Sequence, residues 1–125
     1  MFKWCFNPIG TVFIGKDSIK NLDLSFLHHW ERINFTHVRD CKHLKRVVYP
    51  ISLKEVSGGL LMNCHAVEEI VILSKDIRFT FGMVINGASS LKRVIFYAET
   101  PPENTDPSAY FLWYTNKDTI LYVPD

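Results

Sequence analysis

Six apolar positions recur three times in this chain at a nearly constant spacing, and this repeat limits the possible folds more than any other feature. Cys41, Cys64 and Ala88 occupy one of these positions and serve as anchors, 23 and then 24 residues apart. The other five positions keep fixed offsets from the anchors, which is typical of a repeat protein whose units pack on one another. They are occupied by Trp30, Leu53 and Ile77; Val38, Leu61 and Ile85; Leu44, Val67 and Leu91; Val47, Ile70 and Val94; and Tyr49, Ile72 and Phe96.

This repeat predicts a mainly β solenoid. The last two apolar positions of each unit are two residues apart, which is the period of a half-buried strand. One coil cannot cover its own apolar side, whereas stacked coils bury a shared column, with neighbouring strands about 4.8 Å apart. The composition agrees, because eleven Leu, eleven Ile and ten Val stand against four Ala and no Gln. We therefore expect a parallel sheet on one face, with strands near 46–50, 69–73, 93–97 and 119–123.

The 125 residues are enough for one domain with its own core, and the units at the two ends of a solenoid are usually irregular. A single domain over 1–125 is therefore expected. Its first expected part is an N-terminal cap at 1–20 with a strand-like run at 11–14. Repeats of about 23 residues follow at 21–97 and begin with a strand at 22–26. A closing unit at 98–125 contains a loop at 103–116, with a helical turn at 108–112, and a last strand at 120–123.

Charge and hydropathy exclude several classes of partner. The formal net charge is +1, so the chain has no strong field for nucleic acid or an anionic membrane. No apolar run approaches the about 20 residues of a membrane-spanning helix, so membrane insertion is not expected. Polar residues, Pro8 and Gly10 interrupt the N-terminal segment, so the chain shows no signal-peptide core. Three cysteines do not make a disulfide framework, and they leave the cellular compartment open.

The cysteines and histidines give only weak evidence for chemistry. Cys41 and Cys64 lie near His43 and His65, but structural zinc sites usually space their ligands by two to four residues. Two stacked core cysteines are the favoured interpretation, and a disulfide between adjacent coils stays open as an alternative. Cys5 has no recognisable nucleophile motif around it and is taken as a thiol of the cap. No catalytic residue, metal ion or cofactor is therefore expected.

Charged residues on the predicted strands alternate in sign from one repeat to the next. A second row one position earlier, Lys45, Glu68 and Lys92, alternates as well. Opposite charges on neighbouring strands would stabilise the stack and penalise a slipped register. We interpret the main row as a structural charge ladder, with a recognition surface for a charged partner as the alternative. Its expected members are Asp23, Arg46, Glu69 and Arg93.

An apolar stripe is predicted beside this charge ladder, on the face of the strands opposite the core. Soluble monomers rarely leave such a stripe exposed, so a ligand, a second copy of the chain or the 103–116 loop would cover it. The alternative is simple β-propensity, because Val and Ile suit strands even in solvent. The candidate interaction face consists of Val48, Val71, Leu73, Ile95, Tyr97 and Leu121, with Val123 further along the last strand.

The unit at 47–64 has a Pro after its strand, a Gly-Gly turn, an apolar pair and Asn-Cys. The closing unit has a Leu-Lys pair, a Thr-Pro-Pro and a Leu-x-Val-Pro. In these features residues 30–125 resemble the BspA-type leucine-rich-repeat family, and 47–64 is the best-matched unit. The pattern is blurred at 77–85, and Ala88 replaces the cysteine of that repeat. The resemblance implies a right-handed leucine-rich-repeat solenoid, without enzymatic activity, in a bacterial surface or secreted protein that binds host proteins or other cells.

Two function classes follow from these observations. The leading hypothesis is a binding module that presents a solenoid face to a protein or a glycan, with weak homo-oligomerisation as a further possibility. The alternative is a structural spacer or capping fragment of a longer surface protein, without a ligand of its own. A contiguous exposed apolar patch favours the first, and isolated exposed apolar groups favour the second. An enzyme is the weakest option, because no set of convergent titratable residues stands out.

Overall fold

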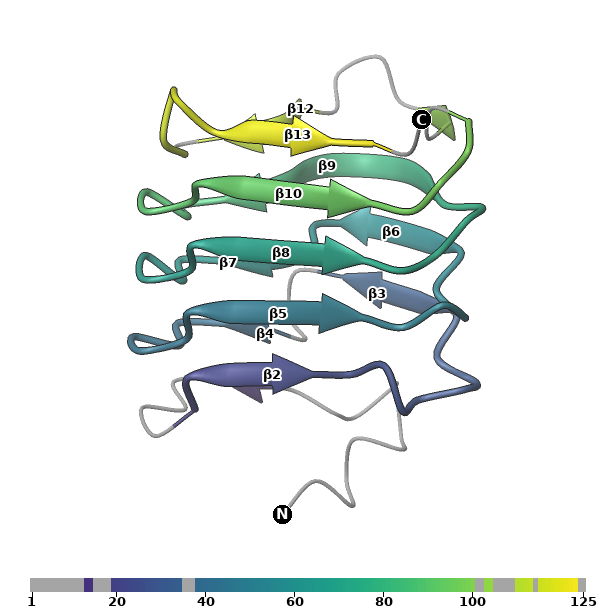
Figure 1. Ribbon diagram of the computed structural model, residues 1–125, viewed down its shortest axis with the longest axis horizontal. Helices are drawn as coiled ribbons and strands as arrows, with labels where there is room; N and C mark the ends of the chain where they lie inside the picture. The colour runs from purple at the N-terminus through teal and green to yellow at the C-terminus, as the bar shows by residue number, and fades with distance from the viewer. Residues whose placement is uncertain are drawn as a thin grey trace.

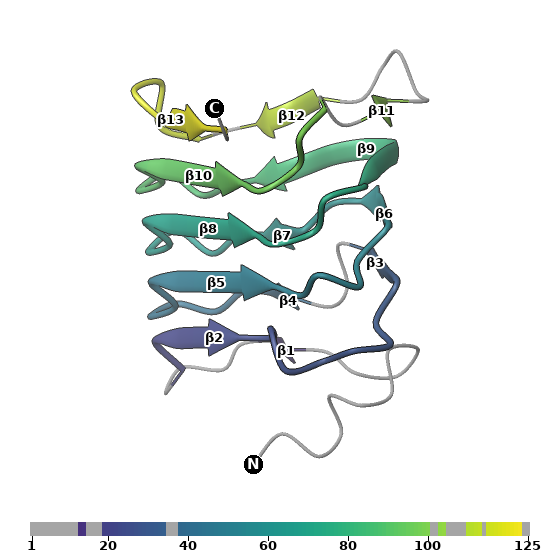
Figure 2. The same cartoon turned by 45° about the vertical axis from the view of Figure 1, so that its right-hand side comes forward.

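A computed structural model describes residues 19–34, 38–100 and 115–123, together with the backbone of 13–14, 103–104 and 110–113. This part of the chain is mainly β and contains no helix. It forms the stacked coils of a β-solenoid of about three turns, as the repeat predicted. Figures 1 and 2 show the coils stacked on one another, from β2 at one end to β13 at the other.

One side of the solenoid is a parallel sheet of five strands, one from each successive coil. Adjacent strands pair in register, for example Val47 with Ile70 and Ile70 with Val94. All five strands were predicted, although the first was expected at 22–26 and begins and ends earlier. In spatial order the strands are β13 (Ile120–Tyr122), β10 (Arg93–Phe96), β8 (Glu69–Ile72), β5 (Arg46–Tyr49) and β2 (Asn21–Asp23).

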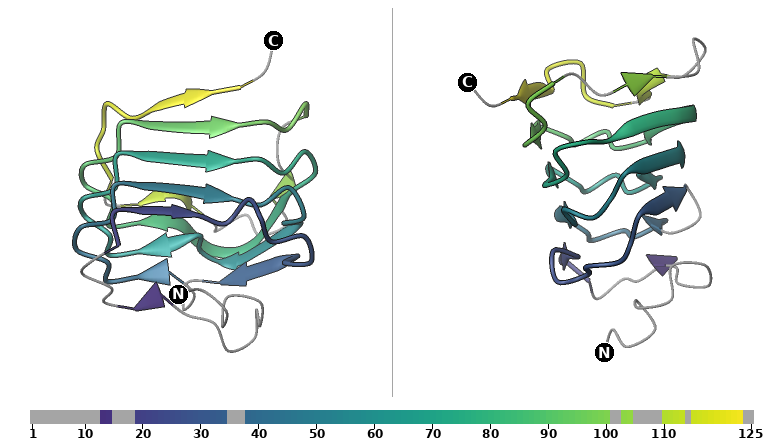
Figure 3. Two further views of the ribbon diagram at one scale, coloured as in Figure 1. Left: turned by 60° about the horizontal axis from the view of Figure 1, so that its bottom comes forward. Right: turned by 90° about the vertical axis from the view of Figure 1, so that its right-hand side faces the viewer.

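The return path of each coil also forms strands, which make up an eight-stranded parallel sheet on the other side. Figure 3 shows the two sets of strands facing each other across the core. The sequence predicted only a turning path here, and it predicted a helical turn at 108–112, where the structure instead has a strand that pairs with β9. The strands are β1 (Phe13–Ile14), β3 (Arg32–Asn34), β4 (Val38–Arg39), β6 (Glu55–Gly58), β7 (Leu61–Met62), β9 (Arg78–Asn86), β11 (Glu103–Asn104) and β12 (Tyr110–Trp113).

The repeat positions form the core between these sheets. All three members of all six predicted columns are buried, including the anchors Cys41, Cys64 and Ala88. The Tyr49 hydroxyl lies inside the coil and donates a hydrogen bond of 2.7 Å to the Leu60 carbonyl, which links the two sides of the solenoid. Burial, with the nearby cysteines as a smaller cause, raises the pKa of Tyr49 well above its ordinary value. Among the described tyrosines only Tyr49 is buried, and its hydroxyl has a hydrogen-bond partner.

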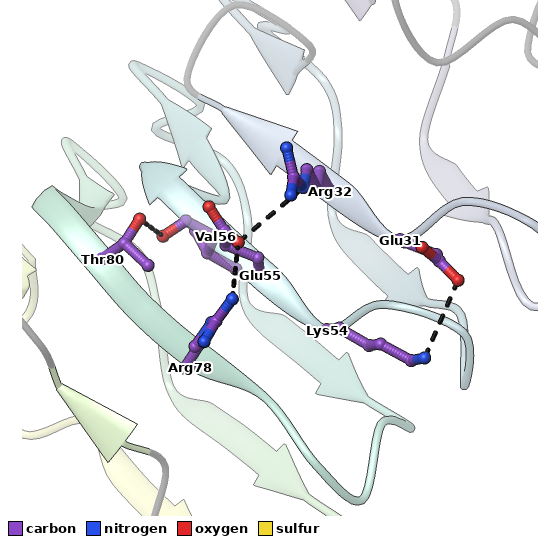
Figure 4. Close-up of polar contacts among 7 residues, drawn as sticks. All are labelled: Glu31, Arg32, Lys54, Glu55, Val56, Arg78 and Thr80. Atoms are coloured by element: carbon purple, nitrogen blue, oxygen red, sulfur yellow. Dashed lines mark hydrogen bonds and ion pairs between the residues drawn. The ribbon is translucent and has the colours of Figure 1, made fainter.

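A further core column was not predicted. A β-bulge beside it explains the one-residue change in repeat spacing. Val56 pairs with Ile33 on one side and Phe79 on the other, and all three are buried. The register then shifts, because Ser57 pairs with Phe81 and Thr80 is left over as a β-bulge. The Thr80 hydroxyl donates a hydrogen bond of 3.4 Å to the Val56 carbonyl (Figure 4). This bulge accounts for the extra residue between the anchors Cys64 and Ala88.

The residue before each anchor has a left-handed backbone. Its φ is 57° at Asp40, 55° at Asn63 and 80° at Gly87. Asp, Asn and Gly are the residues that tolerate this conformation, so each coil turns its corner in the same way. The turn after the anchor recurs as well. The Leu91 N–H donates to the Ala88 carbonyl at 3.1 Å, and in the last coil the Thr119 N–H donates to the Asn116 carbonyl at 3.1 Å. The 58–59 turn also has positive φ, as its Gly-Gly pair predicted.

The two described cysteines are free thiols stacked in the core. The Cys41 thiol donates to the Arg39 carbonyl at 3.5 Å, and the Cys64 thiol donates to the Met62 carbonyl at 3.4 Å. The neighbouring Cys41 and burial both raise the pKa of Cys64 far above its ordinary value, so little thiolate forms. The third cysteine, Cys5, lies outside the described residues.

Native-state thiol titration is therefore expected to label at most one cysteine quickly. Cys41 and Cys64 should react only after unfolding, because the reactive thiolate is suppressed and both sulfurs are inaccessible. The measurement is stopped-flow reaction with a chromogenic disulfide, with and without denaturant. Rapid labelling of all three thiols in the native protein would show that the anchor column does not face the core.

Candidate functional site

The outer face of the five-stranded sheet carries the predicted charge ladder in its central strands. Arg46, Glu69 and Arg93 lie in register on β5, β8 and β10. Each arginine Nε donates to a different oxygen of the Glu69 carboxylate, both at 2.5 Å. The Glu69 side chain is only 14% exposed. The hydrogen bond from Arg46 is the largest cause that lowers the pKa of Glu69, and the bond from Arg93 is the second. Burial opposes both by raising this pKa.

Reversing the central charge is expected to destabilise the fold. Glu69→Lys replaces two ion pairs with like charges beside Arg46 and Arg93, so the free energy of unfolding should fall by about 1–2 kcal/mol at low salt. Salt should reduce the loss because it screens the repulsion. Urea denaturation at two salt concentrations measures this, with Glu99→Lys in the exposed turn after β10 as the matched control. Equal stabilities of Glu69→Lys and the parent at low salt would contradict the observed adjacency.

The lowered pKa of Glu69 also sets the pH dependence of its contribution. A carboxylate with a lowered pKa in the folded state stabilises the fold above its unfolded pKa of about 4.3. That contribution is lost as the pH falls through the folded pKa. The stability difference between the parent and Glu69→Gln should therefore be largest near neutral pH and shrink below about pH 4.3.

Asp23 was expected in this ladder and is not a register partner of Arg46. The strand β2 pairs two residues earlier, so that Asn21 lies opposite Arg46 and Asp23 lies opposite Val48. The Asp23 carboxylate instead accepts the Ser25 N–H at 2.9 Å. The Ser25 side chain, then this N–H, lower the pKa of Asp23, and Arg46 is a minor cause. The first coil is longer than 23 residues, which displaced the prediction. Asp23 therefore stabilises a turn.

A second charge ladder lies on the opposite side of the solenoid and was missed. Glu55 on β6 lies between Arg32 on β3 and Arg78 on β9, at 3.7 Å and 3.2 Å (Figure 4). Lys54 and Glu31 make a further pair at 3.7 Å. The spacing of 23 residues between these partners was present in the sequence, so the same test that found the first ladder would have found this one. Ladders on both sides favour a structural role for alternating charge.

The predicted apolar stripe is mostly covered. Val48 and Val71 retain only 6% and 5% exposure although they lie outside the core cluster. Val48 lies in register between Asp23 and Val71, and Val71 lies between Val48 and Ile95. Leu73 and Ile95 are half-buried, and Tyr97 is 48% exposed. The expectation of an exposed stripe along the whole sheet is therefore wrong for its first two members.

Leu121 was placed on the wrong face of the last strand. It pairs with Val94, a core position, and Tyr122 pairs with Ile95. The corner before β13 is one residue shorter than in the other coils, and a shift of one residue exchanges the two faces of a strand. β13 is an edge strand of this sheet, and all three of its residues are exposed. The exposed residues near this end, here called the C-terminal patch, are Tyr97, Ile120, Leu121, Tyr122 and Val123.

The described part of the 103–116 segment does not lie over this face. Its strands β11 and β12 both pair with β9 in the other sheet, so they cannot cover the stripe. His43 and His65 are exposed at the corners while the neighbouring cysteine thiols point to backbone carbonyls. Within the described ranges, no three His, Cys, Asp or Glu residues are grouped so that they could hold a metal ion. The same ranges contain no helix with the length and apolarity needed to cross a membrane.

Comparisons of the chain with models of known protein families, with curated proteins and with solved structures found no match. The family resemblance of the repeat therefore stays an expectation, and the geometry of the described residues carries the functional argument.

Proposed function

We propose that this chain is a non-enzymatic binding module that contacts a protein partner through the C-terminal patch. The observation that supports the proposal is the exposure of the three residues of β13 and of Val123 after it, between 48% and 68% each, together with the exposed Tyr97. Tyrosine is enriched in protein interfaces because it combines a large apolar area with a polar end. Arg93 lies next to Ile120 in register and adds a cation at the edge of the patch. The resemblance supports a bacterial surface or secreted protein as the setting.

The second candidate function is a spacer or capping fragment. It is favoured by the burial of Val48 and Val71, since the exposed apolar surface does not run along the solenoid. It is disfavoured by the number of large apolar side chains exposed at and near β13, because single exposed apolar residues are ordinary on soluble proteins, whereas clusters mark contacts. The two candidate functions differ in whether substitutions in the C-terminal patch weaken association with a partner.

The test is a double substitution within the patch. Tyr97→Ser with Tyr122→Ser removes two aromatic side chains from the surface without touching the core columns. Ile51→Ser is the matched control, because Ile51 is 59% exposed in the turn after β5, away from the patch. Association is measured by sedimentation velocity of the chain alone and by quantitative capture of a protein fraction on the immobilised chain.

The proposal predicts that the double variant loses at least tenfold in affinity for a captured partner or for a second copy, while Ile51→Ser keeps the parent's affinity. Thermal unfolding confirms that both variants stay folded. Equal association of the parent and the double variant would overturn the patch as the contact surface. Absence of any association of the parent would favour the spacer.

A further inference from the structure

A hollow lies at the corners that lead into β8, β10 and β13, at the opposite end of these strands from Tyr97. Its volume is about 540 Å³, within the range of small-molecule sites of about 300–1,000 Å³. Three successive coils contribute to it, and these corners are the loops to the left of the strands in Figure 1. The lining residues are Asn63, His65, Asn86, Gly87, Ser89 and Thr115.

Gly87 gives this hollow its shape. It occupies the column of Asp40 and Asn63, but it brings no side chain to the corner. A Cβ at Gly87 would lie 2.9 Å from Oδ1 of Asn63, so the Asn63 amide extends toward the space that the glycine leaves open. The Asn63 N–H donates to the Asn86 carbonyl at 2.9 Å, which fixes the backbone that carries this amide. The hollow therefore lies where Gly87 interrupts a column of side chains, and the Asn63 amide oxygen lies beside that gap.

The chemistry of the lining selects a neutral ligand. Among the described lining residues are two amides, two hydroxyls and an imidazole, and no carboxylate, ammonium or guanidinium. Amides and hydroxyls both donate and accept hydrogen bonds, which matches ligand groups that also do both. A cation would require carboxylates, and a tightly held anion would require lysine or arginine. Hydroxyl groups are the ligand groups that fit this set.

We propose that the hollow binds a neutral saccharide. Asn63, Ser89 and Thr115 come from successive coils, so the hollow presents hydrogen-bonding side chains from three coils. Several such groups along the stack suit the several hydroxyls of an oligosaccharide chain. This site is separate from the C-terminal patch and does not depend on the protein-binding proposal, so the chain carries a glycan site in addition to its protein contact.

The experiment is an NMR titration of the ¹⁵N-labelled chain with maltose, cellobiose and N,N′-diacetylchitobiose, each to 20 mM. At least one disaccharide is expected to give saturable shifts with a millimolar Kd, concentrated at the backbone amides of 63–65, 86–90 and 115–117. Inorganic phosphate is the comparison probe, and it should give no saturable shifts at these amides at pH 7.5. Sugar binding should persist in the Tyr97→Ser, Tyr122→Ser variant, which separates this site from the patch.

Two substitutions locate the site without straining the fold. Asn63→Gly removes the amide and keeps the left-handed backbone, and Ser89→Ala removes an exposed hydroxyl. Together they should weaken sugar binding at least fivefold. Lys42→Ala is the matched control, since Lys42 follows its anchor as Ser89 does, two coils away, and does not line the hollow; it should bind as the parent does. Absence of saturable shifts with all three disaccharides, unchanged binding by the double variant, or tighter binding of phosphate than of any sugar would each overturn the proposal.

Discussion

Replacing Ile70 with alanine is expected to lower the free energy of unfolding by about 2–5 kcal/mol. Ile70 is fully buried and pairs in register with Val47 and Val94, so its side chain packs within the core column between two neighbouring coils. The substitution removes three carbons and leaves a cavity that the stacked coils can fill only partly. Urea denaturation followed by far-UV circular dichroism measures the change.

Ile51→Ala is the matched control for this prediction. It removes the same atoms from a side chain that is 59% exposed, so its cost should stay within about 0.5 kcal/mol. Similar costs at the two positions would show that residue 70 does not face the core, and the inward column would be wrong.

Replacing Gly87 with alanine is expected to cost about 1–3 kcal/mol. Two effects add. The φ of 80° is unfavourable for any residue with a Cβ, and the new Cβ would lie 2.9 Å from Asn63 Oδ1. The measurement is again equilibrium denaturation, together with the spectrum of the native state to confirm an unchanged fold.

Asn63→Gly provides the control for the second effect. At a φ of 55°, glycine suits the backbone as well as asparagine does, so the single variant should differ little from the parent. Combining it with Gly87→Ala removes the contact with the amide oxygen but leaves the strained φ and the 3.2 Å approach to the Asn63 backbone. The double variant should therefore regain part of the lost stability. A Gly87→Ala variant as stable as the parent would contradict the left-handed corner.

The buried columns could be predicted because the coils are nearly equal in length. Where spacing is constant, a residue such as Ile70 identifies its neighbours Val47 and Val94 by arithmetic alone, and the register agrees. Prediction failed where the length changes. The longer first coil displaced Asp23 from the ladder, and the shortened corner before β13 moved Leu121 to the other face.

Other differences come from features that a repeat does not encode. The burial of Val48 and Val71 could not be predicted, because a strand pattern specifies only which face a residue takes. The hollow depends on the absence of a side chain at Gly87, which becomes informative only once Asn63 is known to lie beside it. The second ladder at Glu55 could have been found, because its partners keep the 23-residue spacing.

The stacked parallel register is the central claim, and nuclear Overhauser contacts between backbone protons test it most directly. We expect contacts that link Val47 to Ile70 and Ile70 to Val94 on one side, and Ile33 to Val56 on the other, in the pattern of parallel strands. Antiparallel contacts between these segments, or sequential amide contacts typical of a helix across 69–72, would contradict the β-solenoid.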